Sequence, residues 1–416
     1  MMQVSEYRHL KIVELVMPSS AILYYVSLCY KLHFVGIAAV FFMLCMIPFM
    51  RIHRSSVFSA MAILSILYTA LCTVTAVQFN VFYGVVRAFQ FITMSLAGIA
   101  FANYMYSATN ENKALFLKCF TIVTALILSH VVIYHLSTGR LISWKHLYDT
   151  KLVFSTSPCL LFFYQSDIRR KIGDIAFWAI LSVLVLFVLL SGERKAYLLV
   201  TMGFLFSASS VTSKATLMML AGTLASFFII TAEPGDYVSR QLTSFVESEA
   251  QEYSYSDLMQ EESLGYRSDL ARKFANENGK RLFQENPLFG VGASGYQAWA
   301  YEKFGRPDQL RLTGNIHGEI HRLPAENGIV GVVIAALYFL TISILVAKYV
   351  LRRGGLASNS RVRGILIVYS MLLIYAGTEA LDSTLITLIL FFGMFVAVES
   401  RKDAIGLGAK PATVAT

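Results

Sequence analysis

Long apolar stretches constrain this chain more than any other feature. A helix that crosses a hydrocarbon core of ~30 Å needs about 20 mostly apolar residues. Twelve stretches are candidates by that criterion, and the sixth and twelfth of them are short. The sequence therefore predicts an all-α polytopic membrane protein of about 12 transmembrane helices. The predicted spans are residues 12–30, 33–50, 57–77, 80–106, 114–135, 152–165, 174–190, 195–210, 215–231, 328–350, 364–381 and 383–398.

The composition excludes the main soluble classes. Hydrophobic residues make up 56% of the chain and charged residues 15%, against roughly 45–50% and about 25% in soluble domains. The five cysteines show no C-x-x-C spacing, so neither a disulfide framework nor a zinc site is expected. The net charge of +9 is typical of cytoplasmic loops rich in Lys and Arg, and we expect a lipid bilayer and no nucleic acid as partner.

The loop charges predict the orientation, because basic residues concentrate on the cytoplasmic side. Both termini are predicted to be cytoplasmic, which places sixteen basic residues in the inner segments and six in the short outer loops. The outer six are Lys31, Arg140, Lys145, Lys151, Arg194 and Lys195.

This topology divides the chain into four parts. Residues 1–231 hold spans one to nine, 232–327 form an outer loop domain, 328–398 hold spans ten to twelve, and 399–416 form a cytoplasmic tail. The loop domain contains 15 of the 26 acidic residues, so it faces water. Leu270, Phe274 and Leu282 recur in it at helical spacing, which predicts a folded and functional loop.

Two arginines of the outer side are candidates for anion binding. Arg194, followed by Lys195, lies at the outer mouth of span seven; it is a functional cation, a snorkelling anchor or a partner of Glu193. Arg267 shares a helical face with Leu270 and Phe274. It pairs with Asp269 or another acid of the loop, or it binds a phosphate through its planar fork.

A histidine segment precedes span ten. His317 is a natural proton acceptor near neutral pH, and Glu319 and His321 follow it closely. On one helix the two histidines would share a face, but Gly318 stands where a zinc-protease motif requires Glu, so no metal is expected. We expect Pro324 to lie in the first turn of the next helix, whose positive end would favour an anion.

Span four contains a charged residue, Arg87. It is either a fourth candidate at the site or the partner of an intramembrane acid, for which the candidates are Glu14, Glu379 and Asp382. Those acids would also suit a proton path, so a secondary transporter or lipid flippase is an alternative of a different class. A transporter concentrates its polar residues at mid-membrane, whereas these candidates cluster at one surface.

The motifs together resemble the O-antigen ligase and polymerase superfamily of bacterial envelope glycosyltransferases. The segment Asn286 to Tyr296 is similar to the family's "NPLxGxGxGxF" pattern, and His317 precedes Gly328 and Gly331 by the family's spacing. Leu190 to Arg194 resembles the "S-x-S-R" edge of a middle span, and Arg267 falls where a loop arginine is expected. Gly318 departs from the pattern, which usually has Asn, Ser or Gln there; Glu319 or Asn315 could replace that group.

The resemblance implies metal-independent, inverting transfer of a glycan from undecaprenyl diphosphate to a hydroxyl, at the periplasmic face of the bacterial inner membrane. It implies His317 as the base and Arg194 and Arg267 as ligands of the diphosphate, without a cofactor. The preferred hypothesis is an O-antigen ligase that uses the lipid A–core saccharide as its acceptor. A polymerase or a protein oligosaccharyltransferase of the same superfamily is the alternative, and the short segment 136–151 favours the ligase because polymerases generally show two large loops.

Overall fold

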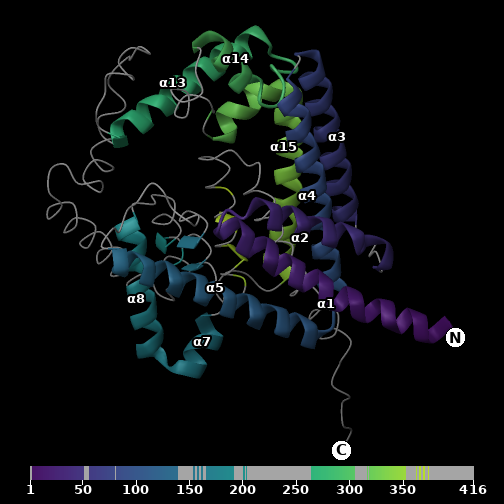
Figure 1. Cartoon of the computed structure of the whole chain (residues 1–416), viewed down its shortest axis with the longest axis vertical. Helices are drawn as coiled ribbons and strands as arrows, with labels where there is room; N and C mark the ends of the chain where they lie inside the picture. The colour runs from purple at the N-terminus through teal and green to yellow at the C-terminus, as the bar shows by residue number, and fades with distance from the viewer. Residues whose placement is uncertain are drawn as a thin grey trace, which may run out of the picture.

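The computed structural model describes eleven helical elements and no strand within its described residues (Figure 1). These residues are 2–50, 56–79, 81–138, 153–154, 157–158, 161–162, 165–191, 200–201, 203, 264–304, 316, 318–352, 362, 365–366, 369–370 and 373. The elements are α1 (Met2–Cys29), α2 (His33–Cys45), η1 (Ile47–Phe49), α3 (Ser56–Gln78), α4 (Phe82–Ser107), α5 (Asn110–Thr138), α7 (Gln165–Ile172), α8 (Asp174–Ser191), α13 (Leu264–Glu285), α14 (Gly295–Phe304) and α15 (Glu319–Arg352).

Five of these helices are long and apolar enough to cross a membrane: α1, α3, α4, α5 and α15. They correspond to five of the predicted spans, so the chain is a helical, multi-pass membrane protein. The predicted seventh span coincides with α8, which has a shorter apolar section. Predicted spans six, eight, nine, eleven and twelve lie largely or wholly outside the described residues, and the number twelve stays a prediction.

The second predicted span, 33–50, is interrupted. Helix α2 ends at Cys45, and the 3-10 turn η1 follows with Pro48 inside it. Proline has no backbone N–H, and its ring clashes with the carbonyl of the preceding turn, so it stops a helix. The 13 residues of α2 rise about 20 Å, less than the ~30 Å of a hydrocarbon core.

Helices α3, α4 and α15 run side by side and form the scaffold of the site (Figure 1). Helices α3 and α4 are an antiparallel pair, joined by a short turn that contains Val81. Large apolar side chains such as Ile63, Val74 and Phe89 are exposed on the outer faces of this bundle. Such an exposed apolar surface suits contact with lipid rather than with water. Helices α1 and α5 are strongly inclined to the three in the same view.

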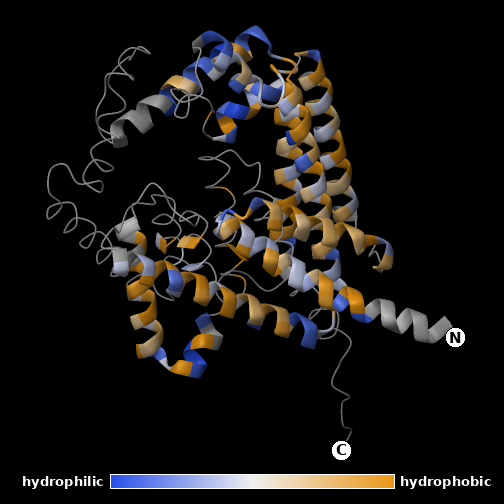
Figure 2. Cartoon of the chain, viewed as in Figure 1, coloured by the Kyte–Doolittle hydropathy of each residue, from blue (hydrophilic) through white to orange (hydrophobic). Residues whose placement is uncertain are grey.

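Helices α13 and α14 form a polar layer above one end of α15 (Figure 2). Their buried faces share a small apolar core with the start of α15, to which Ala275, Leu282, Tyr296 and Ala325 contribute. The predicted helix in the loop domain is therefore confirmed, with Leu282 buried and Phe274 half-buried. This layer rests on the same end of the bundle as the turn between α3 and α4.

The loop 286–294 is hydrogen-bonded to the backbone of α15 at the point where that helix is broken. Gly328, with φ 62° and ψ −164°, is non-helical and divides α15 into two parts. The loop bonds to both parts through main-chain groups. The four N–H to O=C bonds are Val291 to Ala325 (3.0 Å), Gly292 to Glu326 (2.8 Å), Ile329 to Pro287 (2.8 Å) and Val330 to Leu288 (3.2 Å).

The break corrects the prediction that Pro324 lies in the first turn of the tenth span. Helix α15 begins at Glu319, and Pro324 lies inside it. The first amides of the part beyond Gly328 are those of Ile329 and Val330, and both donate to loop carbonyls. An anion therefore does not find these two donors available, because the loop already caps them.

Glycines allow the close approach of the loop. Gly290 adopts φ 67°, and a Cβ there would overlap backbone atoms of Glu326 and Asn327. Gly328 would meet the Leu288 carbonyl in the same way. These glycines occupy positions that no other residue fits, because the left-handed conformation and the short contact act together.

We expect Gly290→Ala to destabilise the protein more than Gly173→Ala. Both glycines have positive φ, so alanine strains each by about 1–2 kcal/mol. A Cβ at Gly173 has nothing within 4 Å, whereas a Cβ at Gly290 collides with α15. The measurement is the apparent unfolding temperature of each purified variant in detergent. Equal shifts for the two variants would contradict a close contact between Gly290 and α15.

We expect Tyr296→Phe to stabilise the protein by about 1 kcal/mol. Tyr296 is fully buried, and within the described chain its hydroxyl has no hydrogen-bond partner, which costs about 1–3 kcal/mol. Burial also raises the pKa of this hydroxyl above its usual range. As pH rises past about 10, the unfolded tyrosine ionises first and the folded state loses stability.

The phenylalanine variant should therefore also show a smaller loss of unfolding temperature between pH 9 and pH 11. Tyr301→Phe is the control, because Tyr301 lies on the same helix and is partly exposed. A destabilised Tyr296→Phe would show that the hydroxyl has a partner.

Candidate functional site

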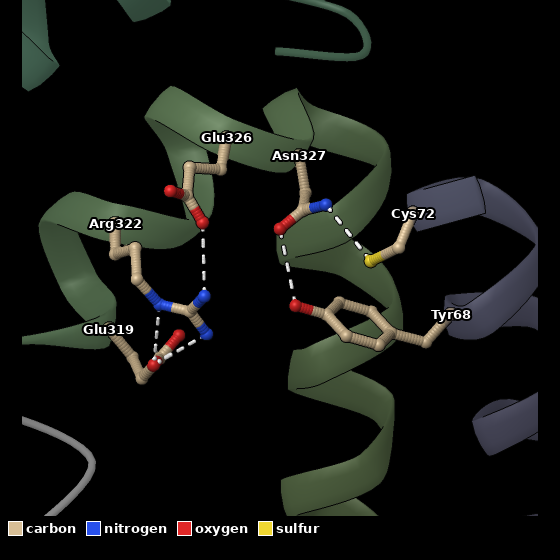
Figure 3. A network of polar contacts seen from close by, with 6 residues as sticks. All are labelled: Tyr68, Cys72, Glu319, Arg322, Glu326 and Asn327. Atoms are coloured by element: carbon tan, nitrogen blue, oxygen red, sulfur yellow. Dashed lines mark hydrogen bonds and ion pairs between the residues drawn. The ribbon is translucent and has the colours of Figure 1, made fainter. Parts of the chain in front are cut away.

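A buried ionic triad occupies the first two turns of α15 (Figure 3). Arg322 donates from Nε to Glu319 at 2.8 Å and from a terminal nitrogen to Glu326 at 3.0 Å. The three residues are spaced by three and four positions, which places them on one face of a helix. All three are less than a tenth exposed.

The triad holds this part of α15 in one geometry. A buried charge is tolerated only when it is paired and hydrogen-bonded, and here one guanidinium serves two carboxylates. The formal charge of the triad is therefore −1. Glu319, a candidate to replace the polar residue that the family has after the histidine, is bonded to Arg322 through one carboxylate oxygen, Oε1.

A second polar network joins α15 to α3 at the residue before the break (Figure 3). The Asn327 side chain accepts a hydrogen bond from the Tyr68 hydroxyl at 3.2 Å. Its amide donates to the Cys72 sulfur at 3.3 Å. Asn327 is fully buried, so these bonds satisfy an amide that would otherwise be costly to bury. The network fixes the rotation of α15 against α3.

Beside these networks lies a cavity of about 230 Å³ between α3, α4 and α15. Charged side chains in its lining are Arg87, Glu319 and Arg322. Other parts of its wall are apolar, including Leu64 and Ile334. The loop 286–294 also reaches the cavity through Ala293. Three helices and one loop, far apart in sequence, therefore share one polar and apolar pocket.

The structure places Arg87 at this cavity, close to the start of α4, with its guanidinium 5.4 Å from the centre of the Tyr83 ring. Glu14 lies near the other end of α4, because its carbonyl accepts a hydrogen bond from Tyr104. The 17 positions between Arg87 and Tyr104 correspond to about 25 Å along a helix. Glu14 is thus remote from Arg87; Glu379 and Asp382 lie outside the described residues.

The remaining predicted residues fall in three groups. His317, Arg194 and Lys195 lie outside the described residues. The backbone of Arg267 belongs to α13, as predicted, while its side chain is not among those that the structure describes. His321 is exposed on α15. Helix α15 begins at Glu319, and the shared helical face of His317 and His321 stays a prediction.

Gly318 has a conformational role at this point. Its φ is 86°, and its carbonyl accepts hydrogen bonds from the amides of His321 (3.2 Å) and Arg322 (3.0 Å). The left-handed backbone is favourable for glycine and costly for other residues. The departure from the family pattern at this position therefore coincides with a sharp turn into α15.

The sequence interpretation missed Arg322, Glu326, Asn327, Tyr68 and Cys72. A signal existed for the triad, since acids three residues before and four residues after an arginine fall on one helical face. No signal in the sequence links Tyr68 and Cys72 to Asn327, because the pairing depends on how α3 packs against α15.

Comparison with known proteins gives one family. Residues 178–336 match the model of a family described as O-antigen ligase. The matched segment includes the loop 286–294, the triad and the break at Gly328. No curated protein matches the chain.

We expect Arg322→Met to destabilise the protein by about 3–5 kcal/mol, because it removes the guanidinium that pairs with two buried carboxylates. Adding Glu319→Gln and Glu326→Gln should recover part of that loss by removing both charges. Arg281→Ala is the control: Arg281 pairs with Glu285 at 3.6 Å on an exposed surface, where an ion pair contributes less than about 1 kcal/mol. Denaturation monitored by circular dichroism measures the differences. An Arg322→Met variant as stable as Arg281→Ala would show that the triad is not structural.

Proposed function

We propose that this chain is an O-antigen ligase. The premise is the match of residues 178–336 to the O-antigen ligase family, together with the helices of a multi-pass membrane protein. Members of this superfamily act on lipid-linked glycans. The proposed reaction transfers a glycan from undecaprenyl diphosphate to a hydroxyl of the lipid A–core oligosaccharide. It takes place at the periplasmic face of the inner membrane.

The proposed mechanism is a single displacement without a metal. His317 takes the proton of the acceptor hydroxyl while the acceptor oxygen attacks the anomeric carbon. The bond between that carbon and the diphosphate oxygen breaks, and undecaprenyl diphosphate leaves with the electron pair. Arg194 and Arg267 stabilise the negative charge that grows on the leaving group. Attack from the opposite face inverts the anomeric centre.

The observation that carries the proposal is the fixed start of α15. His317 is two residues from Glu319 in the chain, which limits the distance between their Cα atoms to about 7 Å. Glu319 is locked by the triad and lines the cavity. The loop 286–294, which carries the family-like motif, is bound to the same part of α15 by main-chain hydrogen bonds. The segment after His317 is thus held rigidly beside a pocket, as positioning of a catalytic base requires.

The distribution of polar groups favours a transferase over a transporter. The triad lies in the first turns of α15, and Arg87 lies close to the start of α4. A transporter gathers such groups near the middle of the membrane, at broken helices. Here the break at Gly328 is filled by main-chain bonds to the loop 286–294, so it does not present open backbone groups to a substrate.

Transfer by the purified protein tests the function directly. The protein in detergent with EDTA is mixed with an undecaprenyl-diphosphate glycan, which is also the acceptor for a polymerase, and with lipid A–core or a protein acceptor. The products are separated by electrophoresis. Glycan on lipid A–core supports the ligase. Longer lipid-linked chains would identify a polymerase instead, and glycan on a protein acceptor would identify an oligosaccharyltransferase. Transfer to none of the three acceptors would contradict the proposal.

We expect His317→Ala to lower the transfer rate about 10²–10⁴-fold, because the acceptor proton loses its base. Arg194→Ala and Arg267→Ala should each lower it about 10²–10³-fold by leaving the diphosphate charge less stabilised. His33→Ala is the control, since His33 is an exposed histidine at the start of α2. Normal transfer by His317→Ala would remove it as the base, and unchanged donor binding in both arginine variants would remove the diphosphate role.

A further inference from the structure

We infer that the cavity between α3, α4 and α15 binds one uncharged sugar ring of the lipid-linked glycan. The inference rests on the proposed function only in naming the lipid that carries the sugar. The cavity itself, its lining and its size are features of the described structure.

The size of the cavity limits its occupant. Its volume is about 230 Å³, below the range of roughly 300–1,000 Å³ typical of sites for drug-sized ligands. A whole repeat unit or a lipid headgroup with several sugars does not fit this space. A single ring does, with the rest of the glycan outside.

The charges of the lining suit a neutral ligand rather than an anion. Arg87, Glu319 and Arg322 line the cavity. Glu326, which pairs with Arg322 behind the lining, brings the sum of the four formal charges to zero. A phosphate only accepts hydrogen bonds and needs donors around it. A sugar hydroxyl both donates and accepts, so it can use the carboxylate of Glu319 and the guanidinium of Arg87 at the same time.

Aromatic rings on the wall add a second feature of a sugar site. Tyr68 and Phe91 lie side by side, with ring centroids 4.7 Å apart, and Tyr83 contributes a third ring. The C–H bonds on one face of a sugar ring pack well against the electron-rich face of an aromatic ring. The lining thus offers both hydroxyl partners and an apolar platform, as an amphipathic ring requires.

The position of the cavity connects it with the proposed chemistry. Glu319, which lines the cavity, is two residues from the proposed base His317. A sugar ring held here lies beside the segment that would activate the acceptor. The cavity would therefore select the sugar whose anomeric carbon reacts or its neighbour, and Arg87 would act as a specificity residue.

A pair of neighbouring alanines provides the test. Ala335 lines the cavity, while Ala336 is exposed on the surface of α15. Ala335→Phe places a ring in the cavity, and Ala336→Phe adds the same ring outside it. The measurement is the affinity of each variant, in lipid nanodiscs, for hexosyl undecaprenyl diphosphate and for undecaprenyl diphosphate without sugar. The ratio of the two affinities isolates the contribution of the sugar.

We expect the wild type to bind the hexosyl lipid about tenfold more tightly than the bare lipid, which is about 1.4 kcal/mol. Ala335→Phe should bring the ratio close to one, and Ala336→Phe should leave it unchanged. Equal weakening of both ligands by Ala335→Phe would show that the cavity holds the lipid or the diphosphate and would overturn the inference. A wild-type ratio of one, or no effect of Ala335→Phe, would overturn it as well.

Two substitutions of Arg87 separate sugar from anion recognition. Arg87→Gln removes the charge and keeps a planar group that donates and accepts, whereas Arg87→Lys keeps the charge and loses the planar fork. A sugar site predicts that Gln retains more of the affinity ratio than Lys does. The opposite order would identify an anion site and overturn the inference.

This test is independent of the transfer assay. If the protein transfers no glycan but the affinity ratio behaves as expected, the proposed function fails and the sugar site stands. If transfer occurs and the ratio is one, the sugar site fails and the proposed function stands. Unfolding temperatures of the four variants show that each is folded, so a lost ratio is not read from a denatured protein.

Discussion

The main-chain bonds between the loop 286–294 and the broken helix α15 are the constraint on which the rest of the site depends. A helix that breaks at a membrane surface leaves amides and carbonyls without partners, and in an apolar environment this is costly. The carbonyls of Pro287 and Leu288 in the loop accept hydrogen bonds from α15 amides. Two loop amides, those of Val291 and Gly292, donate to α15 carbonyls. These bonds join the loop 286–294 and helix α15 into one rigid unit.

The second constraint is the charge buried in that unit. Arg322 pairs with two acids of its own helix, so the triad depends on the helical spacing of the first turns of α15. Asn327 then orients the helix against Tyr68 and Cys72 of α3. The cavity results from both, because its polar wall is made by the triad and its opposite wall by α3 and α4. The proposed transfer and the proposed sugar site rest on the same rigid element.

Sequence patterns predicted the helices well where a single physical rule governs them. Apolar length alone located α1, α3, α4, α5 and most of α15, and helical spacing located α13. Apolar length did not predict the end of α2 at Cys45, where Pro48 of the following turn stops the helix inside an apolar run. It also misplaced the start of α15, since the segment before Gly328 is polar yet helical. Of the predicted site residues, Arg87 and Glu319 lie at the cavity, while His317 and Arg194 stay predictions.

The sequence by itself determined that this chain is a multi-pass helical membrane protein with a family-like segment, because apolar length and motif spacing are local properties. Only the tertiary structure decided which residues meet. The Gly290 and Gly328 positions are used for a close backbone contact, and Arg87 shares a pocket with Arg322, from a helix far away in sequence. Such meetings depend on the packing of three helices and a loop, and packing is set by shape and buried polar pairing, which no local pattern encodes.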